Sequence, residues 1–332
     1  MTHATHVIQD FLLTSGAVLP HVTVAYRRLG EINAARDNVV LVLHGYTTGP
    51  AMLDPGANVA EGSWSELVGP GKPIDTHRYC VICPNMLGSC YGSTGPDFKP
   101  DFPPITVLDI VNTQKALLDA LGIRRLAAVA GPSFGAYQSF QWAASYPDMV
   151  DRVVAAVGAP WHPAPRSADG ILRALHDDAG WDAYRRGERG AMIPFLTAQR
   201  VRTLTLYGVD AELAERFPDH AERAAEVTRL AREWAEQFDP MSLVVLMRAA
   251  ESFDVRPDLV KLRAPVLFVL SRSDPVFSPE LGQAVMRMPG TEHWTYIELD
   301  SDKGHFASGA DAALWAEALR RFMPPPQSGD TV

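Results

Sequence analysis

Cysteine is scarce in this 332-residue chain, which contains three. So few thiols do not form the disulfide framework typical of small secreted domains. Two of them, Cys80 and Cys83, make a C-x-x-C pattern, but they lie in the strand-like run YCVIC. Positions i and i+3 of a strand point to opposite faces, so these thiols are not expected to share a metal or form a redox pair. We expect both to be buried structural residues, and we expect no bound metal.

The chain also lacks long apolar runs and any excess of positive charge. No stretch reaches the length that a bilayer requires, and the first residues, MTHATHVIQDFLL, show no basic start or apolar core of a signal peptide. Lys and Arg number 30 against 39 Asp and Glu, a formal net charge of −9. A nucleic-acid partner would need clustered Lys and Arg. We therefore expect a cytoplasmic protein that acts on small molecules, without a nucleic-acid or membrane partner.

Apolar runs of strand length alternate with helical patterns along most of the chain. Residues 11–25 predict a hairpin, broken at Ser15-Gly16 and Pro20. Further strands are predicted at 38–43, 79–83, 126–130, 153–157, 265–270 and 294–299, with helices at 106–121, after 135, at 279–288 and at 311–322. This alternation indicates an α/β fold with a mostly parallel sheet and helices on both faces.

Between residues 159 and 255 the alternation stops. This region carries helical, charged and alanine-rich segments such as AERAAEVTRLAREWAEQF, and no clear strand. Because the strand–helix pattern resumes afterwards, we expect a helical lid insertion in a core formed by residues 1–158 and 256–323. The last nine residues, PPPQSGDTV at 324–332, are predicted to be a disordered tail.

The stretch from Leu126 to Tyr146 carries the strongest functional signal. A short apolar strand runs into G-P-S-F-G at 131–135, and apolar residues at helical spacing follow. Strand, tight turn and helix form the setting in which G-x-S-x-G is a nucleophile elbow. We therefore expect Ser133 Oγ at the carboxyl end of the sheet, where the helix begins. The alternative is a glycine-rich loop that contains a serine without a catalytic role.

A serine hydroxyl needs an imidazole to accept its proton and an acid to orient that imidazole. In enzymes with this elbow, the acid and then the histidine follow later strands. Asp274 comes directly after PVLFVL, and His305 follows WTYIEL. We expect these residues and Ser133 to form a catalytic triad; otherwise Asp274 is a turn or capping residue and His305 a loop histidine. Other candidates precede these strands or share the loop of the histidine: Asp254, Asp300, Asp302 and His293.

The strand NVVLVL is followed by a loop that begins with His44-Gly45, and the position of this loop predicts a function. In this architecture it supplies the second backbone donor of the oxyanion hole. We expect the backbone N–H groups of Tyr46 and Phe134 to be the two donors, with no part for the Tyr46 side chain. His44 is expected to be structural, since His305 already fits the role of base.

Three segments resemble the homoserine O-acetyltransferase family of the α/β-hydrolase fold: VGPGKPIDTHRYCVICPNMLGSCYGSTGP (68–96), ITVLDIVNTQKALLDALGI (105–123) and SFGAYQSFQWAASYPDMVDRV (133–153). The run N-x-L-G-x-C-x-G-S-T-G-P at 85–96 is long and specific. A weaker similarity extends over residues 13–45 and 271–279, and the helical insertion matches least. The resemblance therefore covers most of the chain.

The resemblance implies a ping-pong reaction without a bound cofactor. The serine takes an acetyl group from acetyl-coenzyme A, or another acyl-coenzyme A, and the acyl-enzyme passes it to a hydroxyl acceptor. Ser133 matches the nucleophile of the family, Asp274 its acid and His305 its base, while Tyr46 and Phe134 match the oxyanion-hole positions. Family members commonly form dimers through the helical insertion, which implies a homodimer here.

The insertion also matches a substrate-binding pattern of the family, in which an arginine is followed seven residues later by a tyrosine. In TAQRVRTLTLY these residues are Arg200 and Tyr207. The resemblance implies that Arg200 binds the carboxylate of the substrate, for which a guanidinium fork is well suited. Arg202 is an alternative for that role, and a solvated helix charge is the alternative for Arg200.

One departure bears on the acceptor. Family members carry an aspartate directly after the catalytic histidine, where it contacts the amino group of the substrate, but this chain has Phe306. An apolar ring does not balance an ammonium group, so homoserine is in question as the acceptor. The sequence thus favours an O-acyltransferase, with a carboxylic-ester hydrolase on the same triad as the second hypothesis. A non-catalytic binding protein on this fold is the third, and the complete triad argues against it.

Overall fold

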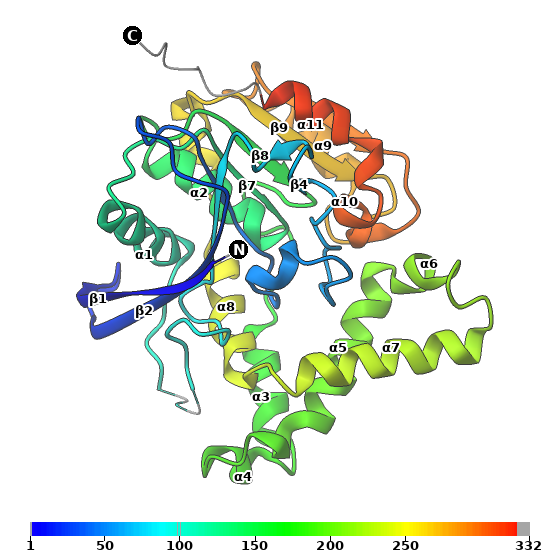
Figure 1. Cartoon of the computed structure of the whole chain (residues 1–332). Helices are drawn as coiled ribbons and strands as arrows, with labels where there is room; N and C mark the ends of the chain where they lie inside the picture. The colour runs from blue at the N-terminus through cyan, green and yellow to red at the C-terminus, as the bar shows by residue number, and fades with distance from the viewer. Residues whose placement is uncertain (1, 98, 100, 324–332) are drawn as a thin grey trace.

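The computed structural model describes residues 2–97, 99 and 101–323. The predicted tail, 324–332, lies outside these residues. Figure 1 shows a central sheet with helices packed on both sides and a group of helices, α3 to α7, that extends away from it. The predicted α/β architecture is therefore confirmed.

The described residues form an eight-stranded sheet in the order β1-β2-β6-β3-β7-β8-β9-β10. β1 pairs with β2 and β2 with β6 in antiparallel fashion, and the remaining neighbours are parallel. Its strands are β1 Thr2–Leu12, β2 Val18–Leu29, β3 Val39–Val42, β6 Cys80–Pro84, β7 Ala128–Pro132, β8 Val153–Ala156, β9 Val266–Ser271 and β10 Thr295–Leu299. Two short strands, β4 Val68–Gly69 and β5 Ile74–Asp75, form a separate pair.

The hairpin is longer than the predicted 11–25. Its pairing reaches Thr2 and Arg28, in a polar and mostly exposed part that has no apolar alternation to reveal it. Pro20 does not break β2, contrary to the prediction. It lies opposite Asp10, whose φ is 48°, and neither residue belongs to a register pair. Because proline has no N–H to donate, the pairing is interrupted at this one position and continues on both sides of it.

Strands β3, β6, β7, β8 and β9 are buried on both faces, which explains their continuous apolar runs, whereas the edge strand β10 is only partly buried. In β3, Val39 and Leu41 face one core cluster, whereas Val40 and Val42 face another. Cys80 and Cys83 divide between these same clusters, so the expected separation of the two thiols is confirmed. The first cluster is covered by α1 Val107–Ala120, α2 Phe134–Ser145, α8 Pro240–Glu251 and α9 Pro279–Val285, and the second by α11 Ala316–Phe322 and the segment with η1 Pro50–Leu53.

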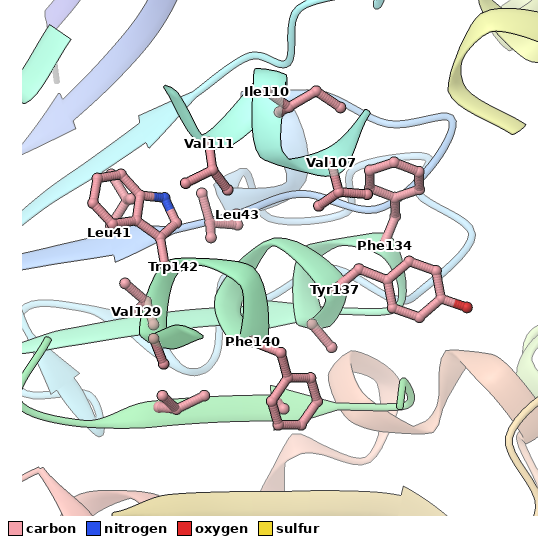
Figure 2. Packing of buried hydrophobic residues seen from close by; sticks show 14 of the residues in the cluster. Leu41, Leu43, Val107, Ile110, Val111, Val129, Phe134, Tyr137, Phe140 and Trp142 are labelled. Carbon is pink, nitrogen blue, oxygen red and sulfur yellow. The ribbon is translucent and has the colours of Figure 1, made fainter. Parts of the chain in front are cut away.

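Helix α2 carries much of the first cluster. Figure 2 shows Phe134, Tyr137, Phe140 and Trp142 on α2 among apolar side chains of α1 and the strands. The start of α1 is fixed by a capping box, because Thr106 accepts from the Asp109 backbone N–H while the Asp109 carboxylate accepts from that of Thr106. α1 and α2 pack on the same face of the sheet, in one core cluster.

The final helix differs from the predicted 311–322. The chain instead forms η4 Gly304–Phe306, α10 Ala307–Ala310, η5 Ala312–Leu314 and α11, and the helix is interrupted at Trp315, where φ is −131°. Trp315 packs edge-on against Trp64 with ring centroids 5.7 Å apart, and its Nε1 donates to the Ser308 carbonyl at 3.0 Å. Burying the indole in this way overrides the helical pattern. The predicted 279–288 helix also ends early, at Val285.

The region between β8 and β9 is helical, with α3 Ala168–Asp177, α4 Trp181–Arg185, η2 Arg189–Met192, α5 Ile193–Tyr207, α6 Val209–Leu213, α7 His220–Ala235, α8 and η3 Arg256–Lys261. α5 and α7 lie side by side (Figure 1). A bridge between Trp161 and Asp254 joins the two ends of this region. α8 lies within the expected 159–255 insertion, yet its Val245 and Leu246 belong to the core cluster beside the sheet.

Candidate active site

Ser133 occupies a strained turn between β7 and α2. Its φ of 57° and ψ of −119° lie in a region that residues with side chains rarely adopt. The flanking glycines are required by close packing: a Cβ on Gly131 would lie 2.3 Å from the Leu43 carbonyl oxygen, and one on Gly135 would lie 2.1 Å from the same atom. The turn thus has the geometry of a nucleophile elbow, at the carboxyl end of a central parallel strand.

The two predicted oxyanion donors lie on either side of this turn. Tyr46 follows β3, and Phe134 is the first residue of α2; their rings stack with centroids 6.3 Å apart. Within the described part of the chain, neither backbone N–H donates a hydrogen bond. The Tyr46 hydroxyl donates to the Leu243 carbonyl, which ties the loop to α8. Both N–H groups are therefore free to face an oxyanion.

A chain of buried side chains holds these two backbone segments together. Gln138 donates to the carbonyl oxygens of His44 (3.1 Å) and Phe134 (3.3 Å), and accepts from Gln114 Nε2 at 2.7 Å. Gln114 in turn accepts from Trp142 Nε1 at 2.7 Å. Every member is buried, so the network fixes the loop after β3 against the start of α2.

His44 has a structural environment. Its Nδ1 contacts the Gly45 carbonyl at 2.9 Å, and Nε2 accepts from the Met86 backbone N–H at 3.2 Å. Burial lowers the pKa of His44 to about 4, so its imidazole is neutral. These contacts support the structural role expected for His44.

Asp274 and His305 are brought together by the loops after β9 and β10. His305 Nδ1 lies 2.7 Å from Asp274 Oδ2, and both side chains are fully buried. Asp274 Oδ1 also accepts the backbone N–H groups of Val276 and Phe277, at 2.8 and 3.1 Å. Burial opposes the charged imidazolium, but the carboxylates of Asp274 and Glu61 together outweigh it, so the pKa of His305 is raised above its ordinary value.

A second set of contacts fixes the two loops relative to each other. Ser273 Oγ donates to the Ser301 carbonyl at 2.8 Å and accepts the Gly304 N–H at 3.0 Å. Ser301 Oγ donates to Asp311 Oδ2 at 2.6 Å. The residues next to Asp274 and His305 are thereby bound to one another.

The imidazole of His305 lies between two aromatic rings. The Tyr207 centroid is 4.4 Å from it, and the Phe277 centroid 5.7 Å. Its Nε2 is buried and has no hydrogen-bond partner among the described residues. The Ser133 side chain, on a residue only 6 % exposed, is not hydrogen-bonded to it in this structure. Nε2 is thus available as a proton acceptor, and such contacts commonly tighten when substrate binds.

Arg200 is buried in spite of its charge, with 1 % of the residue exposed. Its Nη1 donates to Thr47 Oγ1 at 2.8 Å, and the guanidinium lies 4.8 Å from the Trp234 ring centroid. Nε and Nη2 have no partner among the described residues. Burial lowers the pKa of Arg200. Arg202, the sequence alternative, is exposed on the same helix.

Phe306 packs between the core and the helical region. It is 6 % exposed and belongs to an apolar cluster with Ala60, Leu204 and Val209, so its ring faces α5 and α6. The residue beside the histidine therefore presents a hydrocarbon surface where the resemblance implied a carboxylate.

Sequence reasoning missed Glu61. This residue is 2 % exposed, and its charge interacts with those of His305 and Arg200. It lies in the loop AEGSW, which has no motif, periodicity or spacing that marks a functional carboxylate. Only the tertiary structure brings Glu61 to the site.

The fold and the serine turn agree with the sequence family described as alpha/beta hydrolase fold, which matches residues 38–308. The chain is 34% identical to a homoserine O-acetyltransferase of Symbiobacterium thermophilum, over 94% of this chain and 91% of that protein. It is 30% identical to a homoserine O-succinyltransferase of Alkalilimnicola ehrlichii, over 97% and 94%. The chain belongs to the homoserine O-acetyltransferase family within the α/β-hydrolase fold, and it is an enzyme, either acyltransferase or hydrolase.

Solved structures include both activities. The L374D mutant of esterase E22 superposes with a TM-score of 0.84 at 25% identity, covering 97% of this chain and 99% of that one. Homoserine O-acetyltransferase from Bacillus anthracis gives a TM-score of 0.82 at 22% identity, with 97% of each chain covered, and shows the shared fold. Among the described residues, no helix has the length and apolarity needed to span a membrane, and no cluster of three or more His, Cys, Asp or Glu side chains is placed to hold a metal.

Proposed function

We propose that the chain is an O-acyltransferase that works through an acyl-enzyme on Ser133, with acetyl-coenzyme A or another acyl-coenzyme A as donor. The observation that carries the proposal is the Asp274–His305 pair, buried and joined at 2.7 Å, with the opposite imidazole nitrogen not hydrogen-bonded to any described residue. A base oriented by an acid, with an open Nε2, is what a serine nucleophile requires.

In the first half-reaction, His305 Nε2 accepts the proton of Ser133 Oγ as the oxygen attacks the thioester carbonyl. The N–H groups of Tyr46 and Phe134 stabilise the oxyanion that develops. The C–S bond then breaks, His305 returns the proton to the leaving thiolate, and the acyl group stays on Ser133. Asp274 keeps the proton on Nδ1 of the imidazole throughout.

In the second half-reaction, His305 accepts the proton of an acceptor hydroxyl, whose oxygen attacks the Ser133 ester. The tetrahedral intermediate collapses with return of the proton to Ser133 Oγ. We propose that Arg200 binds a carboxylate on the acceptor, because its buried Nε and Nη2 lack partners in the part of the chain that the structure describes, and an unpaired buried guanidinium is costly. Tyr207, against His305, lines the same site.

We further propose that the helices after β8 act as a lid and that the enzyme forms a homodimer through them. The placement of Tyr207 and Gly208 against the His305 loop supports the lid, since a Cβ on Gly304 would lie 2.4 Å from the Tyr207 carbonyl oxygen. Sedimentation of the protein at several concentrations would test the dimer.

A carboxylic-ester hydrolase is the second candidate, favoured by one specific observation. Phe306 leaves the position after the histidine without charge, and water captures an acyl-enzyme whose acceptor binds weakly. The likeness to esterase E22 is compatible with this alternative.

Pre-steady-state release of coenzyme A from acetyl-coenzyme A, with and without L-homoserine, tests the two candidates. A burst followed by turnover that homoserine accelerates is expected for the transferase. Rapid p-nitrophenyl acetate hydrolysis without coenzyme A release would identify a hydrolase. Loss of fluorophosphonate labelling in Ser133→Ala would assign the nucleophile in either case.

A further inference from the structure

Glu61 is a buried carboxylate to which the proposed reaction gives no role. It lies against the loop that carries the Tyr46 donor: a Cβ on Gly45 would lie 2.0 Å from Glu61 Oε1 and 2.8 Å from Oε2. Glycine at position 45 is therefore what lets this carboxylate approach the loop. A carboxylate this close to an oxyanion site has a cost, because it disfavours the developing negative charge.

The segment that carries Glu61 also packs on the residues after the catalytic histidine. A Cβ on Gly62 would lie 2.6 Å from the Phe306 carbonyl oxygen, and Ser308 Oγ donates to the Glu61 carbonyl at 3.1 Å. Ala60 shares an apolar cluster with Phe306. Glu61 therefore comes from another part of the chain to the neighbourhood of position 306, where the family carries its aspartate.

Glu61 and Arg200 are opposite charges that do not pair directly. Arg200 Nη1 is bound to Thr47, while Nε and Nη2 have no partner among the described residues, Glu61 included. Burial raises the pKa of Glu61, and the charges of His305 and Arg200 act against that shift. Two buried charges held apart are costly, and a ligand with one charge for each of them would remove that cost.

We propose that Glu61 binds the ammonium group of a zwitterionic amino-acid alcohol whose carboxylate is bound by Arg200. This assignment rests on the proposed acyl transfer and adds a residue that selects its acceptor. Binding both charges would fix the orientation of the acceptor in the site. The apolar Phe306 is then compatible with an amino-acid acceptor, because the carboxylate comes from Glu61 instead of from the residue after the histidine.

The test compares ligands that differ by one charge. Isothermal titration calorimetry measures the Kd of L-homoserine, of 4-hydroxybutyrate, which lacks the ammonium, and of 3-aminopropan-1-ol, which lacks the carboxylate. The proteins are the wild type, Glu61→Gln and the matched control Glu66→Gln, whose glutamate lies on the same segment but has a side chain 71% exposed and 3.3 Å from Lys72. Thermal unfolding of each protein checks its fold.

The wild type is expected to prefer L-homoserine over 4-hydroxybutyrate, and Glu61→Gln is expected to reduce that preference by about tenfold to a hundredfold, the range of one charge-assisted hydrogen bond. Glu66→Gln should retain it. Equal weakening of both ligands by Glu61→Gln, or no wild-type preference for the amine-bearing ligand, would overturn the inference. Absence of the wild-type preference overturns the inference even if Glu61→Gln does not fold; in that case Glu61→Asp, which draws the carboxylate back by one methylene, replaces it and should weaken the binding of L-homoserine more than that of 4-hydroxybutyrate.

Transfer of the acetyl group is measured separately. If L-homoserine binds with the expected dependence on Glu61 but is not acetylated, the proposed function fails and the ammonium site stands. If it is acetylated while Glu61→Gln affects both acceptors alike, the transferase stands and Glu61 has no role in ammonium binding.

Discussion

The ring of Tyr207 lies 4.4 Å, centroid to centroid, from the imidazole of His305. Tyr207 is the last residue of α5, and Gly208 ends that helix with φ 98°. The end of a helix from the proposed lid therefore contacts the proposed base directly. Lys303 adds a charged link, since its Nζ lies 2.8 Å from Asp311 and 3.9 Å from Glu212 of α6. Movement of α5 would thus change the packing around the imidazole.

Gly304→Ala should disrupt this contact. Gly304 has φ 56°, and a Cβ there would lie 2.4 Å from the Tyr207 carbonyl oxygen, so both backbone strain and steric overlap oppose the alanine. We expect a loss of about 1–3 kcal/mol in the free energy of unfolding and a fall in kcat. The control is Gly170→Ala in α3, which has nothing within 4 Å and should gain about 0.5–1 kcal/mol. Urea unfolding of the two variants checks this, and equal stabilities would contradict it.

Asp274→Asn should lower kcat by about a thousandfold to ten-thousandfold, because an amide no longer fixes the imidazole in the productive tautomer. The isosteric change keeps the space around His305 filled. The measurement is the steady-state rate with p-nitrophenyl acetate, alongside near-ultraviolet circular dichroism to show that packing persists. A fall of less than tenfold would mean that Asp274 does not orient the imidazole for catalysis.

The pH profile should report the raised pKa of His305. Only the neutral imidazole accepts a proton, so kcat/KM should fall as the pH drops through an inflection above the ordinary 6.5. Folding stability depends on pH in the opposite direction. Because the folded state binds the His305 proton more tightly than the unfolded chain does, this group stabilises the protein below about pH 6.5, and the contribution is lost as the pH rises through the pKa of the folded state. Asp274→Asn should move the inflection downward, whereas an unmoved inflection would assign it to another group.

The parallel sheet and the serine turn could be predicted because local sequence determines them. A strand buried on both faces needs a continuous apolar run, and the elbow needs glycine at positions 131 and 135, so both leave a mark on neighbouring residues. The order of Asp274 and His305 after late strands follows from the same topology.

What the sequence did not reveal depends on contacts between distant segments. Glu61 reaches the site only because its loop packs on the residues after His305, and such packing leaves no local pattern. Trp315 interrupts the predicted last helix because its indole packs against Trp64, which is distant in the sequence. The first half of β1 is polar, and its partner strand alone makes it a strand.

Gln138→Leu should weaken the oxyanion hole although it leaves both donor residues, Tyr46 and Phe134, unchanged. The change removes the donor to the carbonyls of His44 and Phe134 and leaves Gln114 Nε2 unpaired, at a cost of about 1–3 kcal/mol in stability. We expect kcat to fall while KM changes little, because the displaced N–H groups act mainly in the transition state. Gln141→Leu is the control, since among the described residues that side chain is hydrogen-bonded to Ser145, on the same helix. If both variants lower kcat alike, the network has no special role.

Arg200→Gln and Arg202→Gln form a matched pair that tests carboxylate binding. Both side chains lie on α5, but Arg200 is buried with two nitrogens that no described residue pairs, and Arg202 is exposed. Because a neutral amide cannot offer a charged fork, Arg200→Gln should raise KM for carboxylate-bearing acceptors by about tenfold or more. It should have a much smaller effect on the KM of neutral alcohols, and Arg202→Gln should affect neither. Steady-state transfer from acetyl-coenzyme A to L-homoserine and to a simple alcohol gives the comparison. An equal rise in KM for both acceptors would show that Arg200 supports the fold of the site, and the carboxylate would then have to be bound elsewhere.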